Sequence, residues 1–194
     1  MSPGRIKISK ALKALLKEKS FDTIKWREIA KTADVSEALI YKYFNSKRNL
    51  LLEVLNEYMC DYLKVLCQQL EGVEGAFNKL KVVVHSTLSA YRESEVLAKI
   101  LIVEVRSDPG YFTSESYEEV QKYSGILLDI IDEGIRLGEI RDDIPPSHIR
   151  QMIMGVIEYM SLSMVFFKKI IDPEVYTDEI CKIIFSGIRK QDSK

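Results

Sequence analysis

The sequence predicts an all-α protein of about nine helices, with a small N-terminal domain and a larger helical domain. Apolar residues recur at helical spacing along nearly the whole chain, and only 5 prolines and 9 glycines occur in 194 residues. Charge divides the chain as well. Residues 1–50 carry 12 Lys and Arg against 5 Asp and Glu, and the remainder carries 16 against 24, from chain totals of 28 and 29. A basic end on an acidic body is typical of a protein that presents that end to phosphate.

The composition is that of an ordinary globular protein, with 46% hydrophobic and 29% charged residues. No uninterrupted apolar run approaches the ~18 residues that a membrane-spanning helix needs. The basic N-terminus lacks the apolar segment of a secretory signal. We therefore expect a cytoplasmic protein with no membrane partner.

The first helix is expected from Arg5 to Ser20, and the stretch from Trp26 to Leu50 then holds two short helical patterns joined by a tight break. Apolar residues at i, i+1 and i+4 give the first pattern one buried face: Ile29, Ala30 and Ala33. After a break over Ala33-Asp34-Val35, Ser36 offers an N-cap hydroxyl for a second helix, Glu37 to Phe44. This spacing is typical of a helix-turn-helix, whose second helix enters the major groove of DNA.

The same stretch resembles the DNA-binding domain of TetR-type transcriptional regulators. The matching residues lie in one register without a gap: Ile29-Ala30, Ala33-Asp34-Val35, Ser36, Ile40, Tyr41, Tyr43, Phe44, Ser46-Lys47 and Leu50. Two positions depart from the family pattern. Lys25 stands where many members have a capping Thr, and Asp34 stands where Gly is usual. Asp tolerates the left-handed backbone expected there better than most residues do.

Nine residues are candidates for DNA contact: Lys25, Arg27, Ser36, Glu37, Ala38, Tyr41, Lys42, Tyr43 and Lys47. The tyrosine hydroxyls can hydrogen-bond to phosphate, the lysines neutralise it, and an acidic residue at the leading end suits only a cytosine amino group. The alternative for each of these residues is that its side chain is simply exposed to water and contacts no DNA. We expect function here because Tyr41, Lys42, Tyr43 and Lys47 serve no evident purpose in a core.

The remaining helices follow in order, with a turn signal at Asp108-Pro109-Gly110. We expect them over Lys47–Leu70, 73–92, 94–107, 114–138, 147–169 and 174–189. The predicted domains are a helix-turn-helix DNA-binding domain over 1–46, called the head below, and a ligand-binding and dimerisation domain over 47–194, called the body. The fourth helix belongs to both rather than forming a flexible linker.

The eighth helix is apolar nearly all round, so it needs more cover than one small domain supplies. The resemblance implies that the eighth and ninth helices form a homodimer interface. The candidate interface residues are Met152, Gly155, Val156, Tyr159, Ser163, Phe166, Ile183 and Ile184. The alternative is that this helix fills only the core of its own chain.

The body is expected to hold an effector pocket among its helices. Its candidate lining is apolar with two polar members: Tyr62, Leu66, His85, Leu88, Tyr91, Leu101, Glu104, Tyr123, Leu127, Met160 and Phe167. Simple core packing is the alternative for each. The phrases over Arg150–Glu158 and Phe185–Ile188 look like the family branch that senses fatty acyl-CoA. An effector of the drug type, in a regulator of an efflux pump, is the other hypothesis.

No catalytic arrangement is evident in the body. His85 and His148 are the only histidines, and they lie in different elements. No phosphate-binding loop, nucleophile elbow or metal-spaced cluster occurs. Three cysteines without CxxC spacing argue against a disulfide framework or a zinc site, and Cys60 and Cys67 are expected in the core. We expect no enzyme, no cofactor and no metal.

These observations predict a ligand-responsive, homodimeric transcriptional regulator, and a repressor in particular. Its partner is double-stranded DNA with an inverted repeat, which places the two recognition helices one turn of DNA, ~34 Å, apart. A small apolar or acyl-CoA-like effector would release it. The alternative from another class is an all-helical lipid or small-molecule carrier or scaffold with a vestigial DNA-binding head.

Overall fold

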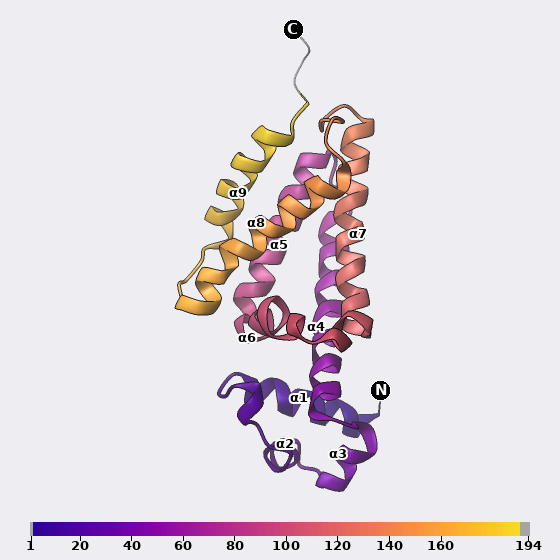
Figure 1. Ribbon diagram of the computed structural model, residues 1–194, viewed down its shortest axis with the longest axis vertical. Coiled ribbons are helices and arrows are strands. Elements are labelled where there is room, and N and C mark those ends of the chain that lie inside the picture. Colours follow the sequence, from indigo (N-terminus) through magenta and orange to yellow (C-terminus); the bar gives the residue numbers. More distant parts are fainter. Residues whose placement is uncertain (1, 191–194) are drawn as a thin grey trace.

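The structure, a computed structural model, describes residues 2–190. It has nine α-helices within that range and no named strand, so the predicted all-α fold is confirmed. The head lies at one end of the long axis and α4 rises from it into the body (Figure 1). The head helices are α1 Pro3–Leu16, α2 Trp26–Ala33 and α3 Glu37–Tyr43, with a 3-10 turn η1 at Phe21–Thr23. The body helices are α4 Lys47–Leu70, α5 Ala76–Glu93, α6 Glu95–Lys99, α7 Glu115–Arg136, α8 Pro146–Phe167 and α9 Pro173–Ile188.

The first helix begins and ends earlier than predicted. The Ser2 hydroxyl accepts a hydrogen bond from the amide of Arg5 at 3.4 Å, and Pro3 follows at the first helical position, where its missing N–H costs nothing. The helix ends at Leu16 because the next residues turn sharply and bring Phe21 back against the head. Apolar periodicity alone does not mark that turn.

The helix-turn-helix has the predicted boundaries to within one residue. A Glu28 side-chain oxygen accepts from the amide of Lys25 at 2.9 Å, so a glutamate supplies the N-terminal cap of α2 that Lys25 itself lacks. Asp34 ends α2 in the left-handed conformation, with φ 54° and ψ 55°. The Ser36 hydroxyl then caps α3 by accepting from the amide of Leu39 at 3.2 Å.

The predicted sixth helix is divided. Its five α-helical residues lead into a π-helical turn, η2, at Ile100–Glu104, and then into a 3-10 turn, η3, at Val105–Ser107. A second 3-10 segment, η4, covers Pro109–Thr113. Five of the six residues from Ile100 to Val105 are apolar, and Ile100, Leu101, Ile102 and Val105 are all buried.

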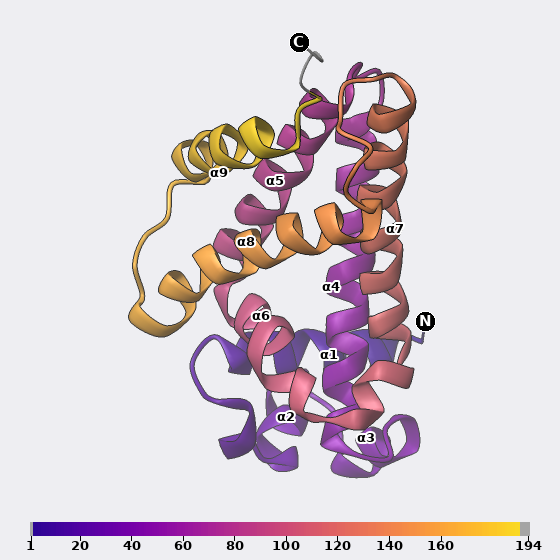
Figure 2. The same ribbon diagram turned by 45° about the horizontal axis from the view of Figure 1, so that its top comes forward.

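In the body, α4 packs along α7 and α5 packs along α9, while α8 crosses them obliquely (Figures 1 and 2). Gly134 of α7 allows a close approach to α5: a Cβ there would lie 2.6 Å from that of Ala76 and 2.7 Å from the Ile140 side chain. None of the helices described in residues 2–190 is long and apolar enough to span a bilayer.

The prediction for two cysteines was wrong. Cys60 and Cys67 do share a face of α4, but it is the outer face and both are exposed. The neighbouring Met59, Leu63 and Leu66 point to the core instead. Cys181 is buried on α9, and burial raises the pKa of its thiol to about 11. Only Cys181 packs in the core. The prediction for Cys60 and Cys67 failed because helical spacing indicates which residues share a face, but not whether that face points inward.

Ion pairs join the head to the body. The Arg5 guanidinium pairs with the Glu53 carboxylate, and Lys13 Nζ lies 2.9 Å from a Glu57 oxygen. Both glutamates belong to α4, so α1 is tied along the shared helix. Further along, Arg48 Nε donates to Asp108 at 2.9 Å, which links the first turn of α4 to the segment between η3 and η4.

Candidate nucleic-acid interface and effector region

The recognition helix α3 turns one side to the head's core and the other to solvent. Ile40 and Phe44 are almost fully buried, with 0% and 2% of their surface exposed. Tyr41 is 55% exposed, and its ring lies 5.5 Å from that of Trp26 at the start of α2. The two helices therefore present one continuous surface at the end of the head farthest from the body (Figure 1).

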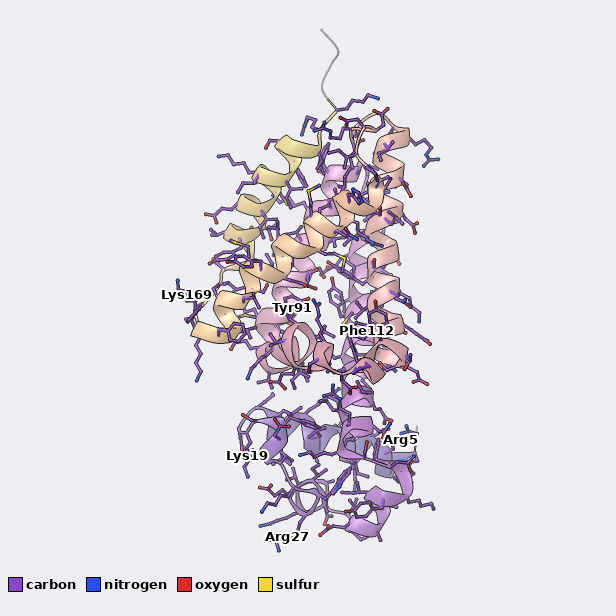
Figure 3. The ribbon with its side chains drawn as sticks, in the orientation of Figure 1. Arg5, Lys19, Arg27, Tyr91, Phe112 and Lys169 are labelled. Carbon is purple, nitrogen blue, oxygen red and sulfur yellow. The ribbon has the colours of Figure 1, made fainter. Side chains whose placement is uncertain are left out.

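Seven of the nine predicted DNA contacts are exposed on the head: Lys25, Arg27, Ser36, Glu37, Ala38, Tyr41 and Lys42. Figure 3 places Arg27 at the outer end of the head. Among residues 2–190, the cations Lys25, Arg27 and Lys42 form no ion pair, whereas Arg5, Lys13 and Lys19 each hold a carboxylate. The unpaired charges face the end where DNA is predicted, and phosphate can neutralise them.

Lys47 has a role in folding that the sequence did not suggest. Its ammonium group donates to the carbonyl oxygens of Phe21, Asp22 and Ile24 at 2.9, 3.3 and 2.8 Å. It also lies 4.7 Å from the centre of the Phe21 ring. The view that Lys47 serves no core purpose was therefore wrong, because its charge ties η1 to α4. Contact between Lys47 and phosphate stays a prediction.

Tyr43 is half-buried rather than free, and the residue that explains it is Gly4. A Cβ at Gly4 would lie 3.3 Å from both Tyr43 and Leu39, so α1 approaches α3 closely at this glycine. Leu39 is also half-buried, which favours packing as its main role. A glycine in the first turn of an otherwise regular helix was the sequence signal for this approach.

A buried cluster of tyrosines lies in the body between α4, α5 and α7. Thr87 donates its only hydroxyl proton to the Val83 carbonyl at 2.7 Å. The hydroxyl groups of Tyr62 and Tyr123 lie 2.8 and 3.1 Å from the same oxygen, so both tyrosines donate to Thr87. Tyr58 donates to the Ala90 carbonyl at 3.0 Å. The result is a satisfied polar network inside an apolar core.

Burial controls the ionisation of this cluster. It raises the pKa of Tyr123 to about 12 and holds those of Tyr62 and Tyr91 well above the ordinary value. The phenols therefore stay neutral donors at physiological pH. Free space in the cluster is only about 20 Å³, and its lining residues are Tyr58, Met59, Tyr62, Thr87, Ala90, Tyr91 and Tyr123.

The structure brings together only some of the predicted pocket residues. Tyr62, Tyr91 and Tyr123 meet in the tyrosine cluster, and four leucines are buried in the surrounding core: Leu66, Leu88, Leu101 and Leu127. His85 instead lines two surface grooves beside α5, and Glu104 pairs with Lys99 at 3.3 Å.

Two further pocket predictions lie away from the cluster. Met160 lines an outer groove, and Phe167 is 74% exposed at the end of α8, so the prediction that Phe167 lines an inner pocket was wrong. Helical spacing alone is consistent with Phe167 pointing either into the body or to solvent. Tyr58 and Thr87 were missed, although a threonine within the apolar stripe of α5 was a visible signal.

The outer face of α8 and α9 is apolar and open. Met152, Tyr159 and Ile183 are 49%, 76% and 74% exposed, and Val156 and Phe166 are exposed as well. Gly155 is also open to solvent, while Ser163 and Ile184 are half-buried. Most of these predicted interface residues line one groove of about 720 Å³ between the two helices.

Comparison with known proteins gives two matches along the chain. Residues 8–54 match the family of bacterial regulatory proteins named tetR, and residues 55–187 match the C-terminal region of YsiA-like protein. The boundary between the matches falls inside α4. Together the two matches cover residues 8–187, which is most of the head and nearly all of the body.

Similar proteins cover nearly the whole chain. The fatty acid metabolism regulator protein of Bacillus subtilis (strain 168) is 25% identical over 189 residues, which is 97% of each chain. The crystal structure of the transcriptional regulator FadR from Bacillus subtilis in complex with stearoyl-CoA aligns with a TM-score of 0.85 and 26% identity, over 95% of this chain and 99% of that one. FadR from Bacillus halodurans has the same fold, with a TM-score of 0.84 and 21% identity over 98% and 99% of the chains.

The head geometry and these matches agree. A capped recognition helix faces outward among unpaired cations, and the family match begins in α1 and runs through this helix. The body match covers most of the chain. The protein therefore belongs to the TetR family of bacterial regulatory proteins, and it is a ligand-responsive, DNA-binding transcriptional regulator.

Proposed function

We propose that this protein is a homodimeric repressor that leaves an inverted-repeat operator when it binds a long-chain acyl-CoA. The observation that carries the effector class is the likeness to FadR in complex with stearoyl-CoA, which extends over 95% of this chain. The aromatic, largely apolar interior of the body supports the same class, because an acyl chain is recognised by apolar surface.

The exposed apolar face of α8 and α9 supports the dimer. A groove of about 720 Å³ lined almost wholly by apolar residues is costly to leave in water. A two-fold axis would set this face against its own copy and bury both. Two heads on one operator also supply the affinity and the spacing that a single small head lacks.

The closed interior supports release by the effector. Free space of about 20 Å³ in the tyrosine cluster is too little for an acyl chain, so binding requires α4, α5 and α7 to move apart. A ligand shifts an equilibrium only when it prefers one of the two states. Because α4 begins in the head, an effector that binds only the opened body also changes the position of the head.

The first test is fluorescence anisotropy on DNA from upstream of the protein's own gene, with a scrambled DNA beside it. We expect tight binding to the upstream DNA, release by palmitoyl-CoA, and loss of binding when Tyr41 and Lys42 are both changed to Ala. Lys182→Ala, which removes an exposed cation from α9, is the control and should bind as the wild type does. Equal, steeply salt-dependent binding to both DNAs would contradict sequence-specific regulation and favour a carrier.

The dimer has its own test by sedimentation velocity. Ile183→Asp places a charge in the α8–α9 groove, and we expect it to convert the dimer to monomer. Ile170→Asp changes a residue that is 91% exposed but does not line the groove, so that variant should remain dimeric. A wild type that sediments as a monomer at micromolar concentration would overturn this part of the proposal.

A further inference from the structure

A surface groove of about 290 Å³ lies between α4 and α5. We call it the α4–α5 groove, and it is one of the two grooves beside α5 that His85 lines. Carboxylate, hydroxyl and amide side chains make up most of its lining, together with two tyrosine rings, whereas the outer groove is lined almost wholly by apolar residues. Neither the proposed DNA contact nor the proposed dimer interface uses these polar groups.

Both helices contribute a carboxylate to the α4–α5 groove. Asp61 belongs to α4, and Glu93 ends α5. Within residues 2–190 neither one forms an ion pair, although Glu53 and Glu57 of the same α4 each hold a cation. No lysine or arginine lines the groove. Its potential is therefore negative, which attracts a cation and repels the phosphates of an acyl-CoA.

A buried hydroxyl group opens into the same groove. Ser86 is only 5% exposed, and its hydroxyl forms no hydrogen bond with any residue from 2 to 190. The neighbouring Thr87 instead donates to the Val83 carbonyl at 2.7 Å, one turn earlier in α5. Leaving a buried hydroxyl without a partner is costly, and a donor in the groove would remove that cost.

Two tyrosines of α4 complete the lining. The hydroxyl of Tyr58 donates to the Ala90 carbonyl at 3.0 Å, and that of Tyr62 lies 2.8 Å from the Thr87 hydroxyl. These bonds hold both half-buried rings against α5. An aromatic face attracts an ammonium group and also packs against methylene groups. The tyrosines therefore favour the same ligand as the carboxylates, an organic cation with an aliphatic part.

We propose that the α4–α5 groove binds a small aliphatic diamine. One ammonium group pairs with Asp61 and the other with Glu93, and Ser86 accepts a hydrogen bond from one of them. Two carboxylates on two helices favour a dication, because a single amine would leave one carboxylate unpaired. A ligand held at both ends joins α4 to α5 and stabilises the closed body.

Histidine signals in NMR spectra of the full chain locate the site. The chain has two histidines, and both are exposed: His85 lines the groove, and His148 lies in the first turn of α8, outside it. Putrescine, which is 1,4-diaminobutane, should shift the imidazole signals of His85 and leave those of His148 unchanged. 1,4-Butanediol has the same chain length but no charge, and it should shift neither histidine.

Isothermal titration calorimetry at low salt measures the contribution of each carboxylate. We expect Asp61→Asn and Glu93→Gln each to weaken putrescine binding about threefold, and the double variant to weaken it about tenfold. Glu179→Gln is the matched control. It makes the same change in net charge by removing an exposed, unpaired carboxylate from α9 outside the groove, and it should bind putrescine as the wild type does.

Ser86→Ala separates binding from folding. We expect it to weaken putrescine binding about threefold without lowering the thermal melting temperature, because the hydroxyl has no bond to lose on substitution. Equal weakening by Glu179→Gln and by the groove variants would reveal diffuse attraction to the acidic body and overturn the site. Butanediol binding as tightly as putrescine, or no putrescine binding at millimolar concentration, would overturn the proposed diamine.

Discussion

The head and the body are both helical, but different kinds of contact hold them. In the head, side chains within three positions cap the helices, as Ser36 and Glu28 show, and Lys47 fastens the turn before α2. In the body, the central polar network joins Tyr62, Thr87 and Tyr123 from three different helices. The comparison teaches that local caps shape most of the surface shown to DNA, whereas the proposed effector region depends on contacts between helices that can part without unwinding a helix.

The largest expected effect tests whether close packing holds the body together. Gly134→Ala should lower the free energy of unfolding by about 3 kcal/mol, because its Cβ would meet Ala76 and Ile140 at under 3.0 Å. Gly125→Ala on the same helix meets nothing within 4 Å and should stabilise by up to about 1 kcal/mol. Urea denaturation of both variants measures this difference. Equal effects would show that α7 and α5 are not tightly apposed at Gly134.

The next prediction separates folding from DNA contact within the head. Lys47→Met should lower the free energy of unfolding by about 2 kcal/mol, since three carbonyl oxygens lose a charged donor. Lys42→Met removes an exposed, unpaired lysine and should change stability by less than about 0.5 kcal/mol. Lys42→Met should nevertheless weaken binding to operator DNA and flatten its salt dependence. If Lys47→Met proves as stable as Lys42→Met, then the contacts of Lys47 do not stabilise the head as predicted.

The polar network of the body can be broken at one atom. Thr87→Val keeps the shape but leaves the hydroxyl groups of Tyr62 and Tyr123 without their acceptor, at a cost of about 1–2 kcal/mol. Thr32→Val changes an exposed threonine of the head and should have little effect. Thermal melts followed by near-ultraviolet circular dichroism would report the tyrosine environment directly. A Thr87→Val melt identical to wild type would show that the network adds no stability.

The smallest effect concerns the turn of the helix-turn-helix. Asp34 has a φ of 54°, which glycine adopts without a Cβ penalty. Asp34→Gly should therefore stabilise the protein by about 0.5 kcal/mol, and Asp34→Ala should destabilise it by about 1 kcal/mol. Urea denaturation of the two variants measures the sign of each change in the free energy of unfolding. If both variants shift stability in the same direction, the backbone conformation is not what limits this turn.

Much of the head was predictable because its signals are local. The cap at Ser36 and the buried Ile40 follow from neighbouring residues, the resemblance to the family implies the left-handed turn at Asp34, and the structure agrees with each. The ammonium of Lys47 shows where that reasoning stops. Its three acceptors lie more than twenty positions earlier in the chain, so no local pattern indicates them.

The sequence by itself determined the helical class, the helix-turn-helix and its register, because periodicity and capping act within a few residues. Only the tertiary structure decided which side chains meet. It placed Cys60 outside, turned Phe167 to solvent, and left Arg150 half-buried without a counter-ion. Helical spacing states that residues share a face, but the packing of distant helices decides whether that face meets a core, a groove or water.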